Sequence, residues 1–154
     1  MVSIRRAKKE DIKSINSLTL QMHNHLGQLV GISFSFDELE DEFYDEADSL
    51  DEVYVVEVEG KVVGYASFTH KVFEDEWCGR YYRLDHLIVD EGHRRKGYGT
   101  KLLEVMLKKA QNDDANVVAD TFVSNIGTVE FFKRLGFKPF STIFILDRKR
   151  RLKL

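Results

Sequence analysis

The sequence predicts a single α/β domain built on a mixed sheet. Helix-like and strand-like segments alternate along its 154 residues without a repeat period or a linker, which favours one sheet with helices packed on it. Hydrophobic residues make up 43% of the chain and charged residues 32%, proportions typical of a globular protein rather than a disordered one. No apolar run approaches the ~20 residues that a membrane helix needs, so we expect no membrane contact.

Apolar periodicity and turn residues define the elements of the first half. A helical period of apolar residues runs through residues 11–29, and Gly27 and Gly31 bracket a break after it. The acidic stretch that follows is expected to form a second helix. The predicted elements are a strand at 2–6, helices at 11–29 and 36–50, and strands at 53–58 and 61–72 joined by a hairpin turn at Glu59-Gly60.

The second half continues the alternation. A polar loop is expected at 74–79, a strand at 80–89, and a helix after a glycine-containing loop. That helix carries one apolar face, formed by Leu102, Leu103, Met106, Leu107 and Ala110. The remaining predictions are a strand at 115–123, a helix at 126–135 stopped by Gly136, a closing strand at 137–146 and a basic tail at 147–154.

Charge and cysteine content bear on nucleic-acid binding and on the cellular compartment. A net charge of −3 argues against bulk nucleic-acid binding, and we interpret the basic end RKRRLKL as a frayed terminus rather than an RNA contact. The first residues, MVSIRRAKKE, lack a signal-peptide core, and the single cysteine, Cys78, cannot form an internal disulfide. We therefore expect a cytoplasmic protein, in which Cys78 fills space rather than reacts.

One segment predicts a binding site for an anion. An apolar strand at 84–89 leads into a short basic loop and then directly into a helix. Free N–H groups at a helix start and the positive end of the helix dipole attract phosphate. The glycines leave the backbone accessible, and neighbouring cations add charge. The loop and the first helical residue are Arg94, Arg95, Lys96, Gly97, Tyr98, Gly99 and Thr100.

Two common nucleotide motifs do not fit this loop. A phosphate-loop NTPase needs G-x-x-x-x-G-K-[ST], whereas Gly99 is followed by Thr100 and Lys101 in the wrong order and spacing. A dinucleotide-binding loop needs a third glycine where Leu102 stands, and it should lie near the start of its fold. Both classes are excluded.

The chain resembles the GNAT acetyltransferase superfamily over nearly its whole length. RRKGYG fits the family signature [RQ]-x-x-G-x-[GA], and VSNIGTVEFFKRLGFKPF resembles the later family motif about 30 residues downstream. IRRAKKEDIKSI and EGKVVGYASF resemble the opening strand and helix and the central hairpin. The resemblance implies a central, mostly antiparallel mixed sheet of six to seven strands flanked by about four helices.

The resemblance also implies a site for acetyl-CoA. Its pyrophosphate would bind main-chain groups from Arg95 to Thr100, with Arg94 ordering the loop and the Thr100 hydroxyl in reach of a phosphate. Main-chain groups of three strand residues would pair with the pantetheine arm, and one N–H would polarise the thioester carbonyl. Asn125 would contact the same arm, although an N-cap role is an equal alternative. The three strand residues are Leu87, Ile88 and Val89.

The proton chemistry centres on Asp85 and Phe132. Asp85 is expected to orient or deprotonate the amine, because a carboxylate on an apolar strand is costly to bury without a partner. The alternative is an ion pair with Arg83 or Arg5. We place Asp85 on the face of Leu87, with His86 on the opposite face as a core residue. Phe132 stands where the family usually has the tyrosine that protonates the thiolate. Candidates to replace that tyrosine are Tyr81, Tyr82 and Tyr98.

The resemblance implies an N-acetyltransferase that moves an acetyl group from acetyl-CoA to a primary amine in a ternary complex, without a metal. The ten acids between residues 37 and 52 would attract a small cationic amine, a lysine or a peptide N-terminus, unless they form only a solvated face. A non-catalytic acyl-CoA-binding domain is the alternative, because Phe132 removes the acid. Homodimers are common in the family, and the sequence leaves the oligomeric state open.

Overall fold

The computed structural model describes residues 1–31 and 37–145, which fall into two compact units. The first unit is Met1–Phe122 and the second begins at Val123. The single domain expected from the sequence stays a prediction. Within the described residues, no helix combines the length and the apolar character needed to cross a membrane.

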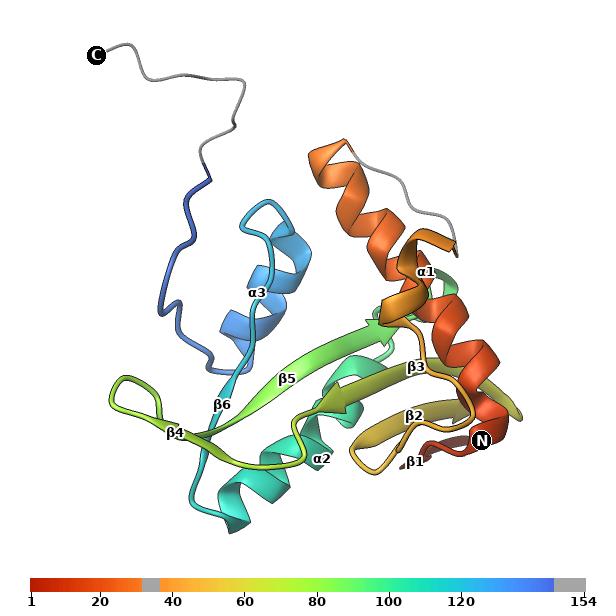
Figure 1. Ribbon diagram of the computed structural model, residues 1–154, viewed down its shortest axis with the longest axis horizontal. Coiled ribbons are helices and arrows are strands. Elements are labelled where there is room, and N and C mark those ends of the chain that lie inside the picture. Colours follow the sequence, from red (N-terminus) through yellow and green to blue (C-terminus); the bar gives the residue numbers. More distant parts are fainter. Residues whose placement is uncertain (32–36, 146–154) are drawn as a thin grey trace. The chain divides into compact units, whose positions relative to one another are not determined.

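A six-stranded mixed sheet forms the centre of the first unit, which confirms the predicted fold class (Figure 1). Neighbouring strands pair antiparallel, except that the last strand runs parallel to the fifth. Pairing follows the order β1-β2-β3-β5-β4, and β6 pairs with β5. The strands are β1 (Val2–Arg6), β2 (Val53–Val58), β3 (Lys61–Phe68), β4 (Phe73–Asp75), β5 (Gly79–Val89) and β6 (Asn116–Val118).

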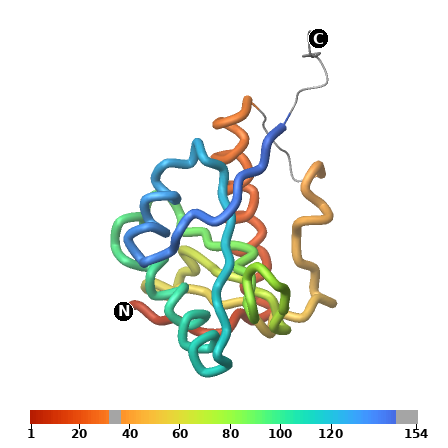
Figure 2. The backbone as a smooth tube through the Cα atoms, turned by 90° about the vertical axis from the view of Figure 1, so that its left-hand side faces the viewer, coloured from red at the N-terminus to blue at the C-terminus, as the bar shows by residue number. Residues whose placement is uncertain are grey.

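Helices α1 (Ile12–Val30) and α2 (Tyr98–Asn112) cover opposite faces of this sheet (Figures 1 and 2). Strand side chains alternate between the two faces of the sheet, so adjacent residues pack against different helices. Val55, Tyr65 and Ile88 pack with Ile15 and Leu18 of α1. The other face places Val56, Val63 and Ala66 against Leu102 of α2. These two clusters fix the sheet between its helices.

Gly60 allows a tight turn between two strands, and Gly64 allows a close approach of two others. The hairpin between β2 and β3 turns at Glu59 and Gly60, as predicted, and their φ values of 49° and 79° are left-handed. Gly64 lies where β3 meets β5, and a Cβ there would stand 2.7 Å from the carbonyl oxygen of Ile88. A side chain at residue 64 would therefore push the central strands apart.

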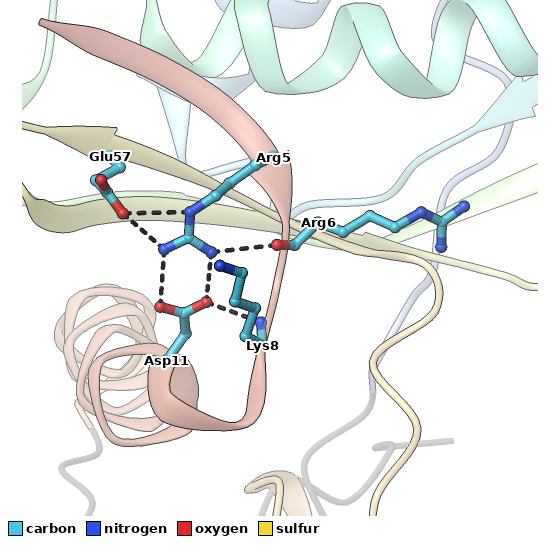
Figure 3. A network of polar contacts seen from close by, with 5 residues as sticks. All are labelled: Arg5, Arg6, Lys8, Asp11 and Glu57. Carbon is cyan, nitrogen blue, oxygen red and sulfur yellow. Dashed lines mark hydrogen bonds and ion pairs between the residues drawn. The ribbon is translucent and has the colours of Figure 1, made fainter.

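Arg5 joins the first two strands to the start of α1 (Figure 3). Its guanidinium donates to both carboxylate oxygens of Asp11, at 2.7 and 3.1 Å, and to Glu57 at 2.6 Å. Asp11 also accepts the Lys8 N–H at 2.8 Å. Burial alone would raise the pKa of Asp11, but the hydrogen bonds from Arg5 and Lys8 outweigh it and lower that pKa.

The predicted helix at 36–50 is wrong within the described residues 37–50. A short 3₁₀ segment, Asp37–Glu42, is followed by turns, and Leu39 alone of that segment is buried. The Asp45 side chain accepts the Ala47 N–H at 2.8 Å, and Asp48 accepts the Asp45 N–H at 2.6 Å. Such local bonds compete with helical ones, and closely spaced acids repel each other in a helix.

Other boundaries also differ from those predicted. The expected loop at 74–79 contains the end of β4, which pairs with the start of β5. Strand β3 ends at Phe68 rather than at residue 72, and β6 covers three residues instead of the span 115–123. Apolar content overestimates strand length here, because a strand extends only as far as a neighbour offers hydrogen bonds.

The second unit contains one helix, α3 (Ile126–Arg134), among its described residues. Gly136 has a φ of 94° and donates its N–H to the Lys133 carbonyl at 3.0 Å, so it ends the helix as predicted. The closing strand expected at 137–146 is wrong for residues 137–145, which form no strand. Four apolar side chains of this segment are exposed, those of Phe140, Ile143, Phe144 and Ile145. Residue 146 and the basic tail at 147–154 lie outside the described residues.

Candidate acetyl-donor site

A basic loop connects the end of β5 to the start of α2. It passes through a 3₁₀ turn, Glu91–His93, and reaches the helix through two residues with left-handed backbone. Arg95 has a φ of 62°, and Gly97, the N-cap residue, has a φ of 80°. The first N–H groups of a helix have no partner within it, so α2 presents them beside this exposed loop. The local geometry suits an anion.

Asp90 and Arg94 hold the loop in place. The Asp90 carboxylate accepts from His93 Nδ1 at 3.0 Å, Gln21 Nε2 at 3.1 Å and the Gly92 N–H at 3.2 Å. The hydrogen bonds from His93 and Gln21 lower the pKa of Asp90, which keeps the carboxylate charged. Arg94 Nε donates to the Val89 carbonyl at 3.1 Å. The arginine side chain thus folds back over the end of β5.

Among the described residues, one edge of β5 has an unpaired stretch. The ladder with β6 covers only Tyr81–Arg83, although β5 continues to Val89. The Asp90 N–H donates to the Val63 carbonyl at 2.7 Å and therefore points toward β3. Main-chain groups alternate along a strand, so those of Val89 and Leu87 face the opposite edge, while those of Ile88 face β3.

A β-bulge in β5 places Asp85 and His86 on the same face. Ser67 pairs with His86 and Phe68 with Leu84, which leaves Asp85 as the extra residue. Ser67 Oγ and His86 Nδ1 are 2.9 Å apart on the side of α1, and Asp85 lines a cavity with Ser67 there. Leu87 packs on the side of α2. The expectation that Asp85 shares the face of Leu87, opposite His86, is therefore wrong.

Asp85 is exposed and weakly paired. Its side chain is 43% exposed, and Oδ1 lies 3.9 Å from Arg83 Nε. Arg83 bonds Asp120 more closely, at 3.0 Å, whereas Arg5 is bound to Asp11 and Glu57 rather than to Asp85. Burial raises the pKa of Asp85, partly offset by His86 and Arg83.

Polar side chains that the sequence analysis did not single out surround the bulge. Tyr44 and Ser67 line the same cavity, and Ser67 Oγ lies 2.9 Å from His86 Nδ1. Burial lowers the pKa of His86, so its neutral form is favoured. Tyr65 contacts the His86 ring at 5.9 Å between centroids. Predicting that these side chains gather would have required the position of the bulge, because the bulge decides which side chains of β5 share a face.

The remaining predicted site residues are Asn125, Phe132 and the three tyrosines that were candidates for the acid. In the second unit, Asn125 precedes α3 without a side-chain capping bond, and Phe132 packs 5.1 Å from Phe137. The Tyr82 hydroxyl donates to Asp113 at 2.6 Å, which raises the pKa of Tyr82 to about 12 and makes it a poor acid. The Tyr81 ring contacts that of Phe73 at a tilt, and Tyr98 packs against the cluster of Val56, Val63, Ala66 and Leu102. Among described residues, no three His, Cys, Asp or Glu side chains form a group that could hold a metal.

Comparisons with known proteins agree with this geometry. Residues 19–137 match the Acetyltransferase (GNAT) family. An uncharacterized N-acetyltransferase of Methanocaldococcus jannaschii is 30% identical over 57% of the chain, and the uncharacterized N-acetyltransferase YobR of Bacillus subtilis is 32% identical over 40% of it. The matched regions span only 39% and 25% of those two relatives.

A solved structure shows the same fold. AAC(6′)-Iy in complex with the bisubstrate analogue CoA-S-monomethyl-acetylneamine aligns with a TM-score of 0.68 and 19% identity, covering 98% of this chain and 99% of that one. The fold likeness and the family match over residues 19–137 therefore agree. The chain belongs to the GNAT acetyltransferase family.

Proposed function

We propose that this protein is an acetyl-CoA-dependent N-acetyltransferase acting on a primary amine. The observation that carries the proposal is the unpaired edge of β5, which leads directly into the basic loop at the start of α2. An extended arm can pair with the edge while a pyrophosphate binds at the loop. The CoA analogue bound to AAC(6′)-Iy, which shares the fold, supports this choice of donor.

The chain offers separate groups for each part of the donor. The N–H groups from Arg95 to Thr100 would bind the pyrophosphate, with the cations of Arg95 and Lys96 beside them. Leu87 and Val89 turn main-chain groups toward the free edge, although Arg94 already occupies the Val89 carbonyl. Leu87 is therefore the main-chain group that we assign to the thioester end of the arm.

Transfer would proceed directly from donor to acceptor. The ammonium loses a proton to Asp85, and the neutral nitrogen attacks the thioester carbonyl carbon, whose developing oxyanion the Leu87 N–H stabilises. The C–N bond forms as the C–S bond breaks, and the CoA thiolate leaves. The thiolate then takes up one proton, for which Phe132 offers no donor. We assign that proton to the newly acylated nitrogen, which loses its second ammonium proton to the thiolate through water.

A binding-only role is the second candidate, and Phe132 is the observation that favours it. A domain that holds acyl-CoA without a group to protonate the thiolate would bind donor but release little CoA. It would show the same donor affinity and the same dependence on the loop. Turnover across a panel of amines separates the two roles.

The donor site can be tested with two matched glycine variants. Gly97 and Gly60 have φ values of 80° and 79°, and no atom lies within 4 Å of an added Cβ at either position. Gly97→Asp and Gly60→Asp therefore introduce the same backbone strain and charge. We expect acetyl-CoA at about 100 times Kd to raise the melting temperature by about 5 °C or more in wild type and Gly60→Asp.

Gly97→Asp should lose that stabilisation, because the new carboxylate repels the pyrophosphate. Equal stabilisation of both variants, or none in wild type, would contradict the donor site. Release of CoA thiol in the presence of amines then tests catalysis. We expect Asp85→Ala to reduce release by about tenfold or more. Donor binding without thiol release across polyamines, amino acids, aminoglycosides and peptides would favour the binding-only role.

A further inference from the structure

A cavity of about 320 Å³ opens beside the bulge of β5. Its walls come from the turns after the 3₁₀ segment Asp37–Glu42, the start of β2, the end of β3, and Asp85. We call it the acidic cavity. Its polar lining consists of Tyr44, Ser49, Asp51, Glu52, Ser67, His70 and Asp85. A space of this size suits a small molecule.

Glu52 is a buried carboxylate with one unsatisfied oxygen. Its side chain is 9% exposed, and Oε1 lies 3.5 Å from Lys109 Nζ and 3.6 Å from His70 Nδ1. Among the described residues, Oε2 has no hydrogen-bond partner. A buried polar atom left without a partner costs free energy, so a group that supplies a hydrogen-bond donor would be bound favourably.

The charges of the cavity determine which kind of hydrogen-bonding group it would bind. Asp51, Glu52 and Asp85 contribute three carboxylates to the lining, while His70 is its only basic residue within the described chain. A ligand that brings a positive charge meets attraction from several sides, whereas an anion is repelled. The apolar side chains of Val53 and Phe68 also line the cavity and suit a short hydrocarbon segment.

We propose that the acidic cavity is the acceptor pocket and that the acceptor is a small diamine, or another amine with a second cationic group. Glu52 binds the second cation, and Asp85 faces the nitrogen that is acetylated. This assignment rests on the proposed acetyl transfer for the identity of the reacting nitrogen. The selection of a second cation rests on the cavity alone.

The test compares two probes of equal carbon length, 1,4-diaminobutane and butylamine. Each is titrated calorimetrically into wild-type protein saturated with CoA, and each is assayed for CoA release from acetyl-CoA. We expect the diamine to bind about tenfold or more tightly than the monoamine, and its kcat/KM to exceed that of the monoamine by a similar factor. Equal affinity for the two probes would overturn the proposal.

Two variants assign the preference to a residue. Glu52→Gln should reduce the ratio of diamine to monoamine affinity by about tenfold, because a neutral amide does not attract the second cation. Glu104→Gln removes one acid from the exposed surface of α2 and should keep the wild-type ratio. A ratio that survives in Glu52→Gln contradicts the role of Glu52. If that variant does not fold, the wild-type comparison of the two probes still decides whether the cavity selects a second cation.

The two readouts separate the pocket from the reaction. Preferential diamine binding without CoA release would overturn acetyl transfer and leave the cation pocket intact. CoA release that is equally efficient with both amines, without any difference in affinity, would support acetyl transfer and overturn the diamine assignment.

Discussion

Ser67 Oγ lies 2.9 Å from His86 Nδ1, and this contact holds a partly buried imidazole beside the bulge of β5. Burial lowers the pKa of His86, so the unfolded chain takes up a proton before the folded protein does. The resulting stability is present above the unfolded pKa of about 6.5 and is lost as pH falls through the lower folded pKa.

We expect His86→Gln to flatten this dependence. Urea unfolding of wild type should show a free energy of unfolding that falls between about pH 7 and pH 5, and the variant should show a smaller fall over that range. Ser67→Ala serves as a companion variant, because it keeps the imidazole but removes its partner. Identical pH slopes in wild type and His86→Gln would contradict a buried neutral histidine.

Acetyl transfer should depend on the ionisation of Asp85. A base must be deprotonated to accept the ammonium proton, and burial raises the pKa of Asp85. We therefore expect kcat/KM to rise with pH through that raised pKa, well below the region in which the free amine itself titrates. Asp85→Asn should lose this limb of the profile along with about tenfold or more of the rate. A variant that retains the limb would assign the base elsewhere.

Gly64→Ala should destabilise the sheet. The added methyl group would lie 2.7 Å from the Ile88 carbonyl oxygen and 2.9 Å from Val56 Cγ1, so β3 and β5 would have to separate. We expect a loss of about 1–3 kcal/mol in the free energy of unfolding, measured in urea. Gly127→Ala in α3 is the control, since no atom lies within 4 Å of its added Cβ. Equal effects of the two substitutions would contradict the close approach at Gly64.

Asp11→Ala should also lower stability, because it leaves the Arg5 guanidinium without its bidentate partner. The Asp11 side chain is 6% exposed, and we expect a loss of about 2 kcal/mol in urea unfolding near neutral pH. The folded pKa of Asp11 is lowered, so this contribution is present above the unfolded pKa and disappears as pH falls through the folded value. Glu10→Ala, at an exposed neighbouring acid, should cost much less.

Phe132→Tyr tests whether a missing acid limits turnover. A tyrosine hydroxyl at this position would protonate the departing thiolate, so we expect CoA release to rise by about tenfold or more. Phe131→Tyr places the same hydroxyl on the adjacent ring of α3 and should give no gain. The same rate in wild type and both variants would show that thiolate protonation does not limit the reaction.

Periodicity and turn chemistry predicted the elements whose own residues determine them. The apolar spacing of α1 and α2, the turn at Glu59-Gly60 and the stop at Gly136 are all local signals, and the structure contains each of them. The acidic segment after α1 misled the prediction, because its side chains bond their own backbone. Strand lengths were also overestimated, since pairing depends on partners distant in sequence.

The same distinction between local and long-range determinants applies to the candidate site. The loop from Arg94 to Thr100 is contiguous, so its motif could be read directly. The shared face of Asp85 and His86 depends on one extra residue opposite Ser67, and the order of residues in β5 does not reveal such a register shift. Glu52 stands next to Asp51 in an acidic run, where its burial cannot be distinguished from the exposure of its neighbours.

The unpaired stretch of β5 also bears on how the protein behaves when it is crowded by copies of itself. An open strand edge can recruit a strand from another molecule and begin an aggregate. Pairing with β6 ends at Arg83, and the bulge at Asp85 interrupts the regular spacing just beyond it. Few residues therefore remain in register for an incoming strand. The edge is therefore too short and irregular to be a good template for a second sheet.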